Sequence, residues 1–362
     1  IITTVSAESM VVSGKTIITI SNSDGVNSNI LLTGLDISGA QLWQKTIDSG
    51  VDEIALASAV DPLGNVWLAG ASSAIPVVES ATAPVQAENP DGVVAEPVTK
   101  LRGDMNQLTL WKLSPLGDLL GTYTLSQSAP ALISAVSVNA SGVSIVGQLL
   151  EKPFVVSATS NGVFGKVISI GTSKTALGAI VRHSDGSVSV FGSSAETLGG
   201  KKLAGVRDGV LIRVSKTGAI ASVVRSSAPK ANRTWLAADS TLALTGFVKS
   251  GKIVETAFTK FTMVFAPTWT MRVPSLGTST VLTAGNTTYG AISSSAAVPG
   301  VIGWKPTSAS VLLLTLDSKG VVSGAYGSSE IAEPISMAYS KELGVVGLAK
   351  TAAQTLSLFK LA

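Results

Sequence analysis

The chain contains no cysteine and a single histidine, and these two absences exclude several kinds of chemistry. Without cysteine there is neither a disulfide bond nor a thiolate metal site. His183 alone cannot supply the two imidazoles of a histidine-based metal centre, and its surroundings in the sequence offer no acid and nucleophile for a triad. It lies in a predicted tight turn at 183–186, where we expect a surface residue. We therefore expect no catalytic residue, no metal ion and no cofactor.

Charge is also scarce, at 14% of the residues, where an average domain has about a quarter. The net charge of +3 comes from Lys and Arg residues that are spread along the chain. A surface that clamps phosphates needs these residues gathered in one patch. The sequence therefore excludes nucleic acid as an expected partner.

Long apolar runs are missing too, although 45% of the residues are hydrophobic. No stretch approaches the roughly 18 consecutive apolar residues of a membrane-spanning helix, so no membrane span is expected. The chain opens on Ile1, without Met and without a basic leader followed by an apolar run. We expect that a signal sequence or flanking region is absent from this chain and that the protein is extracellular or attached to the cell surface.

What the chain does contain is a repeated unit, seen best in residues 29–73. Four apolar runs of strand length occur there, at 30–35, 41–47, 53–60 and 65–69. Two of the links, Asp36-Ile37-Ser38-Gly39 and Asp61-Pro62-Leu63-Gly64, place Asp first and Gly last, which is typical of a type I turn closed by a left-handed glycine in a G1 bulge. The unit is predicted to be an antiparallel meander with positive φ at its turn glycines and at their counterparts, namely Gly39, Gly64, Gly117, Gly142, Gly218 and Gly320.

Looser copies of this unit follow at a period of about 45 residues, with insertions between them. The last strand of each copy ends on an apolar-x-Gly or similar signal, at Gly70, Gly147, Gly192, Gly246, Gly290 and Gly347. Residues 355–361 resemble the first strand of the unit, and the amino-terminal residues resemble its other three strands. The two chain ends together therefore make a seventh copy.

The prediction is an all-β, seven-bladed propeller of four-stranded antiparallel blades, forming one domain over residues 1–362. One carboxy-terminal strand and three amino-terminal strands are expected to close the ring, because closure removes exposed sheet edges. The expected blades are residues 28–73, 107–149, 152–192, 208–247, 255–292, 309–348, and 353–362 with 1–22. Residues 74–106 form a proline-rich insertion.

Three segments carry a resemblance to a known family. DGVLIRVSKTG at 208–218, together with NILLTGLDISG and DPLGNVWLAGASS in the first unit, resembles the bacterial β-propeller repeat of the SBBP type. The resemblance implies the propeller fold and a protein that is exported or held at the surface, while the family implies no particular activity. The recurring Gly-His and Trp-Asp pairs of a WD-repeat propeller are absent.

The predicted topology sorts the loops onto two faces of the ring. The tight turns fall on one, here named the turn face, and the long insertions at 74–107, 193–207 and 293–309 fall on the other, here named the loop face. Binding sites favour variable loops on a rigid scaffold, so we expect a protein or glycan partner there. The candidate binding residues are Arg102, Asp104, Lys201, Lys202, Arg207, Trp304 and Lys305. The alternative is a solvated loop, with Trp304 packed against a blade.

A second group of candidates is acidic and lies in or beside loops of neighbouring blades: Glu8, Asp52, Glu53, Glu330 and Glu333. Paired carboxylates can catalyse glycoside hydrolysis or bind calcium, and the alternative is that all five are solvated. Two functions are therefore open. The first is a non-catalytic binding or structural propeller, and the second is a hydrolase or lyase that acts on polysaccharide. An enzyme requires two carboxylates that face each other across a cleft at the channel mouth.

Overall fold

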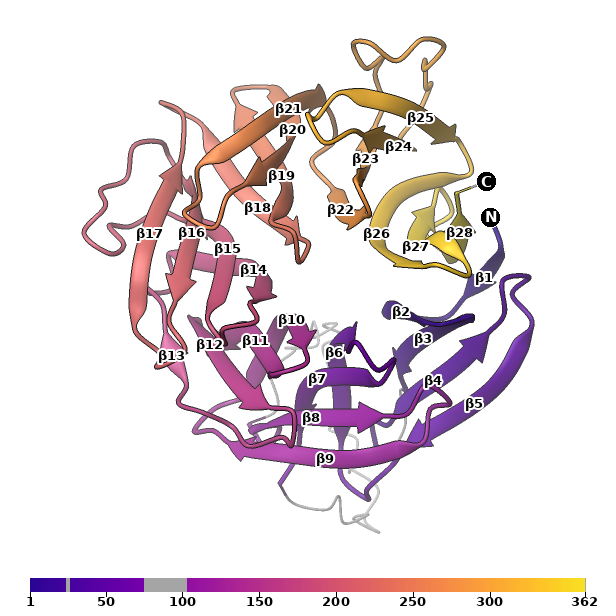
Figure 1. Ribbon diagram of the computed structural model, residues 1–362, viewed down its shortest axis with the longest axis vertical. Coiled ribbons are helices and arrows are strands. Elements are labelled where there is room, and N and C mark those ends of the chain that lie inside the picture. The colour runs from indigo at the N-terminus through magenta and orange to yellow at the C-terminus, as the bar shows by residue number, and fades with distance from the viewer. Residues whose placement is uncertain (24–26, 75–102, 362) are drawn as a thin grey trace, which may run out of the picture.

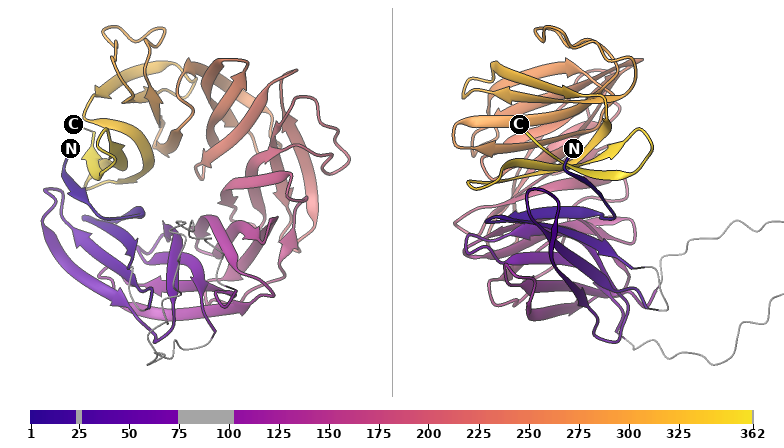
Figure 2. Two further views of the ribbon diagram at one scale, coloured as in Figure 1. Left: turned by 180° about the vertical axis from the view of Figure 1, so that it is seen from behind. Right: turned by 90° about the vertical axis from the view of Figure 1, so that its right-hand side faces the viewer.

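The chain folds into a ring of seven sheets, each with four antiparallel strands, which confirms the seven-bladed propeller (Figure 1). The computed structural model describes residues 1–23, 27–74 and 103–361, and within these it contains 28 strands and no helix. A helix long and apolar enough to cross a membrane is accordingly not found among the described residues. The blades form a single layer, and both chain ends lie at its rim (Figure 2).

Each blade runs from an inner strand beside the channel to an outer strand at the rim. Blade 1 contains β2 (Ser9–Ser13), β3 (Thr16–Asn22), β4 (Ile30–Leu35) and β5 (Gln41–Ile47). Blade 2 contains β6 (Glu53–Val60), β7 (Val66–Ser72), β8 (Gln107–Leu113) and β9 (Leu119–Ser126). Blade 3 contains β10 (Ala131–Asn139), β11 (Gly142–Leu149), β12 (Lys152–Thr159) and the short β13 (Ile168–Ser169).

The other blades follow the same order. Blade 4 contains β14 (Thr175–Arg182), β15 (Val188–Ser194), β16 (Asp208–Val214) and β17 (Ile220–Ser226). Blade 5 contains β18 (Asn232–Ala238), β19 (Ala243–Ser250), β20 (Ile253–Phe261) and β21 (Pro267–Pro274). Blade 6 contains β22 (Ser279–Ala284), β23 (Thr287–Ser294), β24 (Ser310–Leu316) and β25 (Val322–Ser328). Blade 7 contains β26 (Ile331–Ser340), β27 (Gly344–Thr351), β28 (Leu356–Lys360) and, from the amino end, β1 (Thr3–Val5).

The predicted limits of the blades are shifted by two strands. The expected first blade, 28–73, joins β4 and β5 of one sheet to β6 and β7 of the next, and the link at 48–52 connects two blades. The same displacement affects the other expected limits. The reason is that the hairpins β4–β5 and β6–β7 use the same turn chemistry, so turn signals mark the hairpins without showing which two hairpins share a sheet.

The closure of the ring is also the reverse of the predicted one. Three carboxy-terminal strands and one amino-terminal strand make the last blade, with β1 paired to β28 through Thr3, Thr4 and Val5. Two of the amino-terminal runs expected in the closing blade, β2 and β3, lie in blade 1 instead, where β2 pairs with β3 and β3 pairs with β4. Because the backbone of β3 makes its hydrogen bonds with β4, β1 is the amino-terminal strand that pairs with the exposed edge of β28.

The tight turns have the predicted geometry. All six glycines named above have positive φ, between 78° and 138°. At the turn of blade 2, one oxygen of Asp61 accepts the N–H groups of Leu63 and Asn65, both at 2.9 Å. Burial opposes ionisation of this carboxyl, yet hydrogen bonds from Asn65 and Trp67 hold the pKa of Asp61 below its usual value. The N–H of Gly64 donates to the carbonyl of Asp61, and the N–H of Asp61 donates to the carbonyl of Asn65, both at 2.9 Å, which is the expected G1 bulge.

A second, recurrent bulge explains four of the six glycines that mark the period of the sequence. In blades 2 to 5 the inner strand carries an extra residue, and a glycine of the second strand lies opposite the residue before it. A Cβ added at Gly192 would lie 2.0 Å from the carbonyl oxygen of Ala176, and the counterparts Gly70, Gly147 and Gly246 show the same contact at 1.8 to 2.2 Å. Only glycine allows the two backbones this close approach.

The two faces of the ring follow from strand direction. Successive strands are antiparallel, so the links β4–β5 and β6–β7 lie on one face and the links β7–β8, β15–β16 and β23–β24 lie on the other. The described insertions at 195–207 and 295–309 therefore share the loop face. A shift of two strands in the blade limits leaves this assignment unchanged. Most of the first insertion, 75–102, lies outside the described residues.

Substitution of Gly192 by alanine tests the bulge. We expect Gly192→Ala to lower the free energy of unfolding by more than about 2 kcal/mol, because the methyl group would displace a backbone carbonyl. Gly178→Ala is the matched control, since Gly178 is the extra residue of the same bulge and an added Cβ there meets nothing closer than 3.7 Å. Denaturant titration measures both, and equal losses would contradict the interpretation.

Candidate functional site

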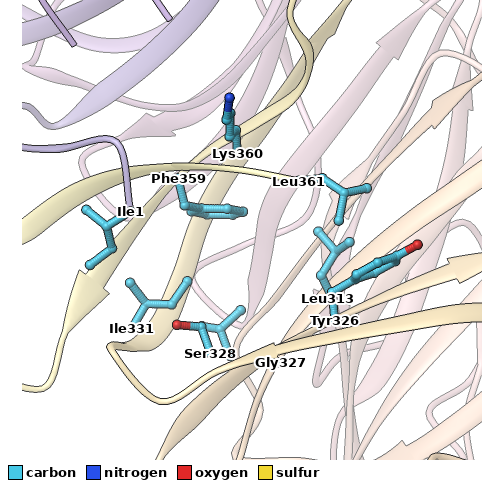
Figure 3. Close-up of a pocket in the computed structure, with 10 residues that line it drawn as sticks. Ile1, Leu313, Tyr326, Gly327, Ser328, Ile331, Phe359, Lys360 and Leu361 are labelled. Atoms are coloured by element: carbon cyan, nitrogen blue, oxygen red, sulfur yellow. The ribbon is translucent and has the colours of Figure 1, made fainter. Parts of the chain in front are cut away.

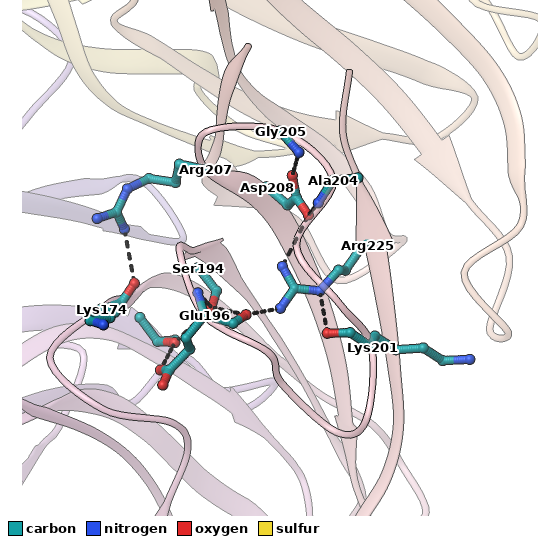
Figure 4. A network of polar contacts seen from close by, with 10 residues as sticks. Lys174, Ser194, Glu196, Lys201, Ala204, Gly205, Arg207, Asp208 and Arg225 are labelled. Carbon is teal, nitrogen blue, oxygen red and sulfur yellow. Dashed lines mark hydrogen bonds and ion pairs between the residues drawn. The ribbon is translucent and has the colours of Figure 1, made fainter. Parts of the chain in front are cut away.

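The loop face carries an insertion between β15 and β16 that is anchored by a buried ion pair (Figure 4). Asp208, the first residue of β16, is fully buried, and its Oδ2 lies 3.0 Å from Nη1 of Arg225 on β17. The backbone N–H groups of Ala204 and Gly205 donate to the same carboxylate at 3.0 and 2.8 Å. The end of the insertion is thus fastened to the start of the strand that follows.

The guanidinium of Arg225 also holds the middle of the insertion. Its Nε donates to the carbonyl oxygen of Lys201 at 3.0 Å, and its Nη2 donates to that of Glu196. A buried ion pair is favourable only when its remaining donors and acceptors are satisfied, and here the guanidinium and the carboxylate each make further hydrogen bonds. The insertion therefore has a defined shape set by one arginine.

Glu196 and Arg207 connect the same insertion to the link between blades 3 and 4. The Glu196 carboxylate accepts the N–H of Thr172 at 2.7 Å and the hydroxyl of Thr175 at 2.6 Å. Burial opposes the negative charge, but these hydrogen bonds hold the pKa of Glu196 below its usual value. Nη1 of Arg207 donates to the carbonyl of Lys174 at 3.3 Å.

The predicted binding residues have different roles in the structure. Lys201 and Lys202 are exposed on the anchored insertion, and Arg207 is part of its anchor. Trp304 packs against β25, so close that a Cβ at Gly327 would lie 2.0 Å from its ring, as the packing alternative expects; Lys305 beside it is exposed. Asp104 takes part in a polar interaction ahead of β8, and Arg102 lies outside the described residues.

The five acidic candidates do not form one cluster. Glu8 and Glu333 line the same cavity of about 570 Å³ at the loop-face mouth of the channel, where Nζ of Lys350 lies 3.9 Å from Oε2 of Glu333. Glu330 is exposed beside β26. Among the described residues, no group of three His, Cys, Asp or Glu side chains could hold a metal ion.

Asp52 and Glu53 have a structural role instead. Both are 1% exposed. Oδ1 of Asp52 accepts the N–H of Ser28 at 2.6 Å, and the Glu53 carboxylate accepts the hydroxyl of Ser49 at 2.5 Å. These two acids fix the link between blades 1 and 2, so the alternative that all five acids are solvated does not hold for them.

His183 lies in its turn as predicted, but it is buried there. It is only 9% exposed, and its Nε2 lies 2.7 Å from the hydroxyl of Ser189. Burial and the positive charge of Arg213 lower the pKa of His183 to about 4. This Ser–His pair is not a nucleophile and its base, since Ser189 has no exposed surface and the Asp185 carboxylate is held by Ser187.

An apolar cavity of about 430 Å³, which the sequence did not reveal, lies between blades 6 and 7 (Figure 3). Leu313 and Tyr326 come from blade 6, and Ile1, Ile331 and Phe359 come from the closing blade. The two chain ends meet at this cavity, and β25 contributes the small residues Gly327 and Ser328 to its lining. Only the excess of small residues in β25 is visible in the sequence.

The fold of the chain is similar to that of several solved propellers. No family model and no curated protein matches the chain. The WD40 domain of Toxoplasma gondii coronin is similar, with a TM-score of 0.55 and 12% identity over 98% of this chain and 81% of that one. The propeller domain of the Trilobed protease from Pyrococcus furiosus has a TM-score of 0.54 and 10% identity, over 97% of this chain and 93% of that one. The β-propeller domain of Myceliophteria thermophila Cps50 (Swd1) has a TM-score of 0.52 and 9% identity, over 99% of this chain and 98% of that one. These likenesses show the fold alone.

Removal of the Arg225 guanidinium tests the anchor. We expect Arg225→Met to cost about 3 to 5 kcal/mol of unfolding free energy, since it leaves the fully buried Asp208 without its counter-charge. Lys45→Met is the control, because its ion pair with Asp118 is largely exposed and is worth at most about 1 kcal/mol. A loss for Arg225→Met no larger than that of the control would contradict the anchor.

The low pKa of His183 predicts a pH dependence of stability. The folded chain has a pKa of about 4 there and the unfolded chain the ordinary 6.5. Between these values the unfolded state binds more protons, so this stability is complete above pH 6.5 and is lost as the pH falls toward 4. We expect a falling melting temperature from pH 7 to pH 5, and a smaller fall in His183→Gln. Equal slopes for both proteins would refute a buried neutral imidazole.

Proposed function

We propose that the chain is a non-catalytic binding propeller that engages a protein or a glycan through its loop face. The observation that supports this most is the anchored insertion at 195–207, in which Arg225 and Asp208 hold the backbone while Lys201 and Lys202 remain exposed. A loop ordered before binding loses less conformational entropy when a partner arrives. The turn face, in contrast, consists mostly of short hairpin links of two to five residues.

The chemistry of the loop face supports a partner that offers acidic groups or hydroxyls. Lys201, Lys202 and Lys305 are cations with access to solvent, and the candidates Arg207 and Trp304 belong to the same two insertions. The candidates of the first insertion are Asp104 and Arg102, the latter outside the described residues. An exported or surface-attached location, as the resemblance to SBBP-type propellers implies, belongs to the same proposal. A chain without cysteine is compatible with such a location.

One observation favours an alternative, a polysaccharide hydrolase or lyase. Glu8 and Glu333 line one cavity at the channel mouth, as an acid and a base would. Incubation with a panel of polysaccharides, followed by product analysis, tests this alternative. Cleavage by the unaltered protein that is lost in both Glu8→Gln and Glu333→Gln would establish the enzyme over the binding protein.

Charge reversal on each face tests the binding proposal. We expect Lys201→Glu combined with Lys202→Glu to weaken binding at least tenfold, with a glycan array and photo-crosslinking to surface proteins of the native host as the two readouts. The matched control is Lys216→Glu combined with Lys319→Glu, which reverses two charges in tight turns of the turn face and should leave binding unchanged. A hydrogen-exchange footprint confined to the turns around Asp36, Asp61, Asp185 and Asp317 would overturn the proposal.

A further inference from the structure

The boundaries between blades share one packing contact, which involves the link from the third to the outer strand of a blade. In blades 1, 2, 3, 4 and 6 this link contains a glycine of positive φ, where an added Cβ would lie 2.0 to 2.9 Å from a side chain on the outer strand of the preceding blade. The pairs are Gly39 with Thr3, Gly117 with Trp43, Gly162 with Tyr123, Gly218 with Ile168, and Gly320 with Trp269. Blade 5 has Phe265 at this position, also with positive φ. The link of one blade therefore covers the outer strand of the blade before it.

Blade 7 has no such link, because its third strand β28 and its outer strand β1 come from opposite ends of the chain. Tyr326 of blade 6 shows the consequence. It is the fifth residue of β25, as Tyr123 is the fifth residue of β9, and each tyrosine lies opposite a leucine of the third strand, Leu313 or Leu110. Tyr123 is partly buried against Gly162, whereas Tyr326 is 47% exposed. The same side chain is thus covered at one boundary and uncovered at the other.

The space left between blades 6 and 7 is the apolar cavity of about 430 Å³. Tyr326, Leu313 and Phe359 line it, together with Leu361 at the end of β28. Among the described residues of its lining only Lys360 is charged, and its amino group points away from the other side chains (Figure 3). The volume lies within the range of ligand pockets, roughly 300 to 1,000 Å³. The cavity therefore suits an apolar group.

Blade 3 shows what fills the corresponding space between blades 2 and 3. Its hairpin, residues 157–165, contains a tight turn in which the N–H of Gly162 donates to the carbonyl of Thr159 at 3.0 Å. Gly162 lies against the Tyr123 ring, and Phe164 packs into the apolar cluster of this boundary. A turn glycine followed two positions later by an aromatic residue therefore fits a tyrosine in this place.

We propose that the boundary between blades 6 and 7 is a docking site for a hairpin turn of a partner protein. A glycine of the turn lies against the Tyr326 ring, and an aromatic side chain beside it enters the cavity. The occupant takes the place of the link that blade 7 lacks, and burial of the Tyr326 ring and of the apolar lining stabilises the complex. The site goes beyond the proposed function, because it lies at the rim and none of the described loop-face candidates lines it.

Fluorine NMR of the protein labelled with ring-fluorinated tyrosine gives the direct test, since the chain contains four tyrosines. The probe is a cyclic peptide of residues 157–165, in which the ring preforms the hairpin. We expect a saturable shift of the Tyr326 signal, assigned by its loss in Tyr326→Phe, while the signal of the covered Tyr123 stays in place. The peptide with Gly162→Val should bind at least tenfold more weakly, because its side chain would meet the ring. Absence of a saturable Tyr326 shift, or equal affinities of the two peptides, would overturn the proposal.

A variant that fills the cavity separates docking there from non-specific contact with the peptide. Ser328 lines the cavity opposite Val311, and the equivalent residue of blade 2 is Leu125. Ser328→Leu should therefore weaken peptide binding at least tenfold without lowering the melting temperature. Ala325→Leu is the matched control, since it adds the same side chain at an exposed position of β25 outside the cavity, and it should keep the affinity within twofold. Similar affinities of the two variants would contradict the site.

The same fluorine signal distinguishes two other occupants. A saturable shift of Tyr326 with toluene, and none with the cyclic peptide, would assign the cavity to a small apolar molecule and overturn the docking site. A shift that grows with protein concentration in the absence of peptide would assign it to a second copy of the chain, with the same consequence.

Discussion

The pairing of β1 with β28 is the contact on which the rest of the ring depends. It consists of three residue pairs and one further hydrogen bond, from the N–H of Ile2 to the carbonyl of Leu358 at 2.7 Å. Next to this β1–β28 seam, Val12 and Ile17 of blade 1 pack against Val346 and Leu348 of blade 7 in one buried cluster. Every blade contributes to clusters of this kind with its neighbours, so an open ring would expose two such surfaces to water.

The parts of the fold that the sequence predicts are those set by neighbouring residues. The Asp-x-x-Gly turns, the positive φ of their glycines and the number of blades follow from local chemistry, and the structure confirms them. The limits of the blades and the direction of closure depend on which distant strands pair. The links at 36–40 and 61–65 look alike, although one joins the outer strands of blade 1 and the other the inner strands of blade 2.

The candidate site shows the same division. The exposed lysines of the second insertion could be recognised from a polar loop between two strands. Their anchor could not, because Asp208 and Arg225 are 17 positions apart and nothing in their surroundings marks them as buried. The burial of Asp52 and Glu53 was hidden for the same reason. A charged residue in a sequence is most often solvated, and only the packing around it shows the exception.

The most direct test of the closed ring uses the absence of cysteine. The hydroxyl oxygens of Thr4 and Ser357 lie 3.5 Å apart across the seam, on residues that are directly opposite, so Thr4→Cys combined with Ser357→Cys would give the chain its only two thiols. Mild oxidation should form the disulfide quantitatively and raise the unfolding free energy by about 4 kcal/mol, since the bond closes nearly the entire chain into a loop. Reduction should reverse the gain. Thiols that stay free in the folded protein, or a disulfide that leaves the unfolding transition unchanged, would contradict the account.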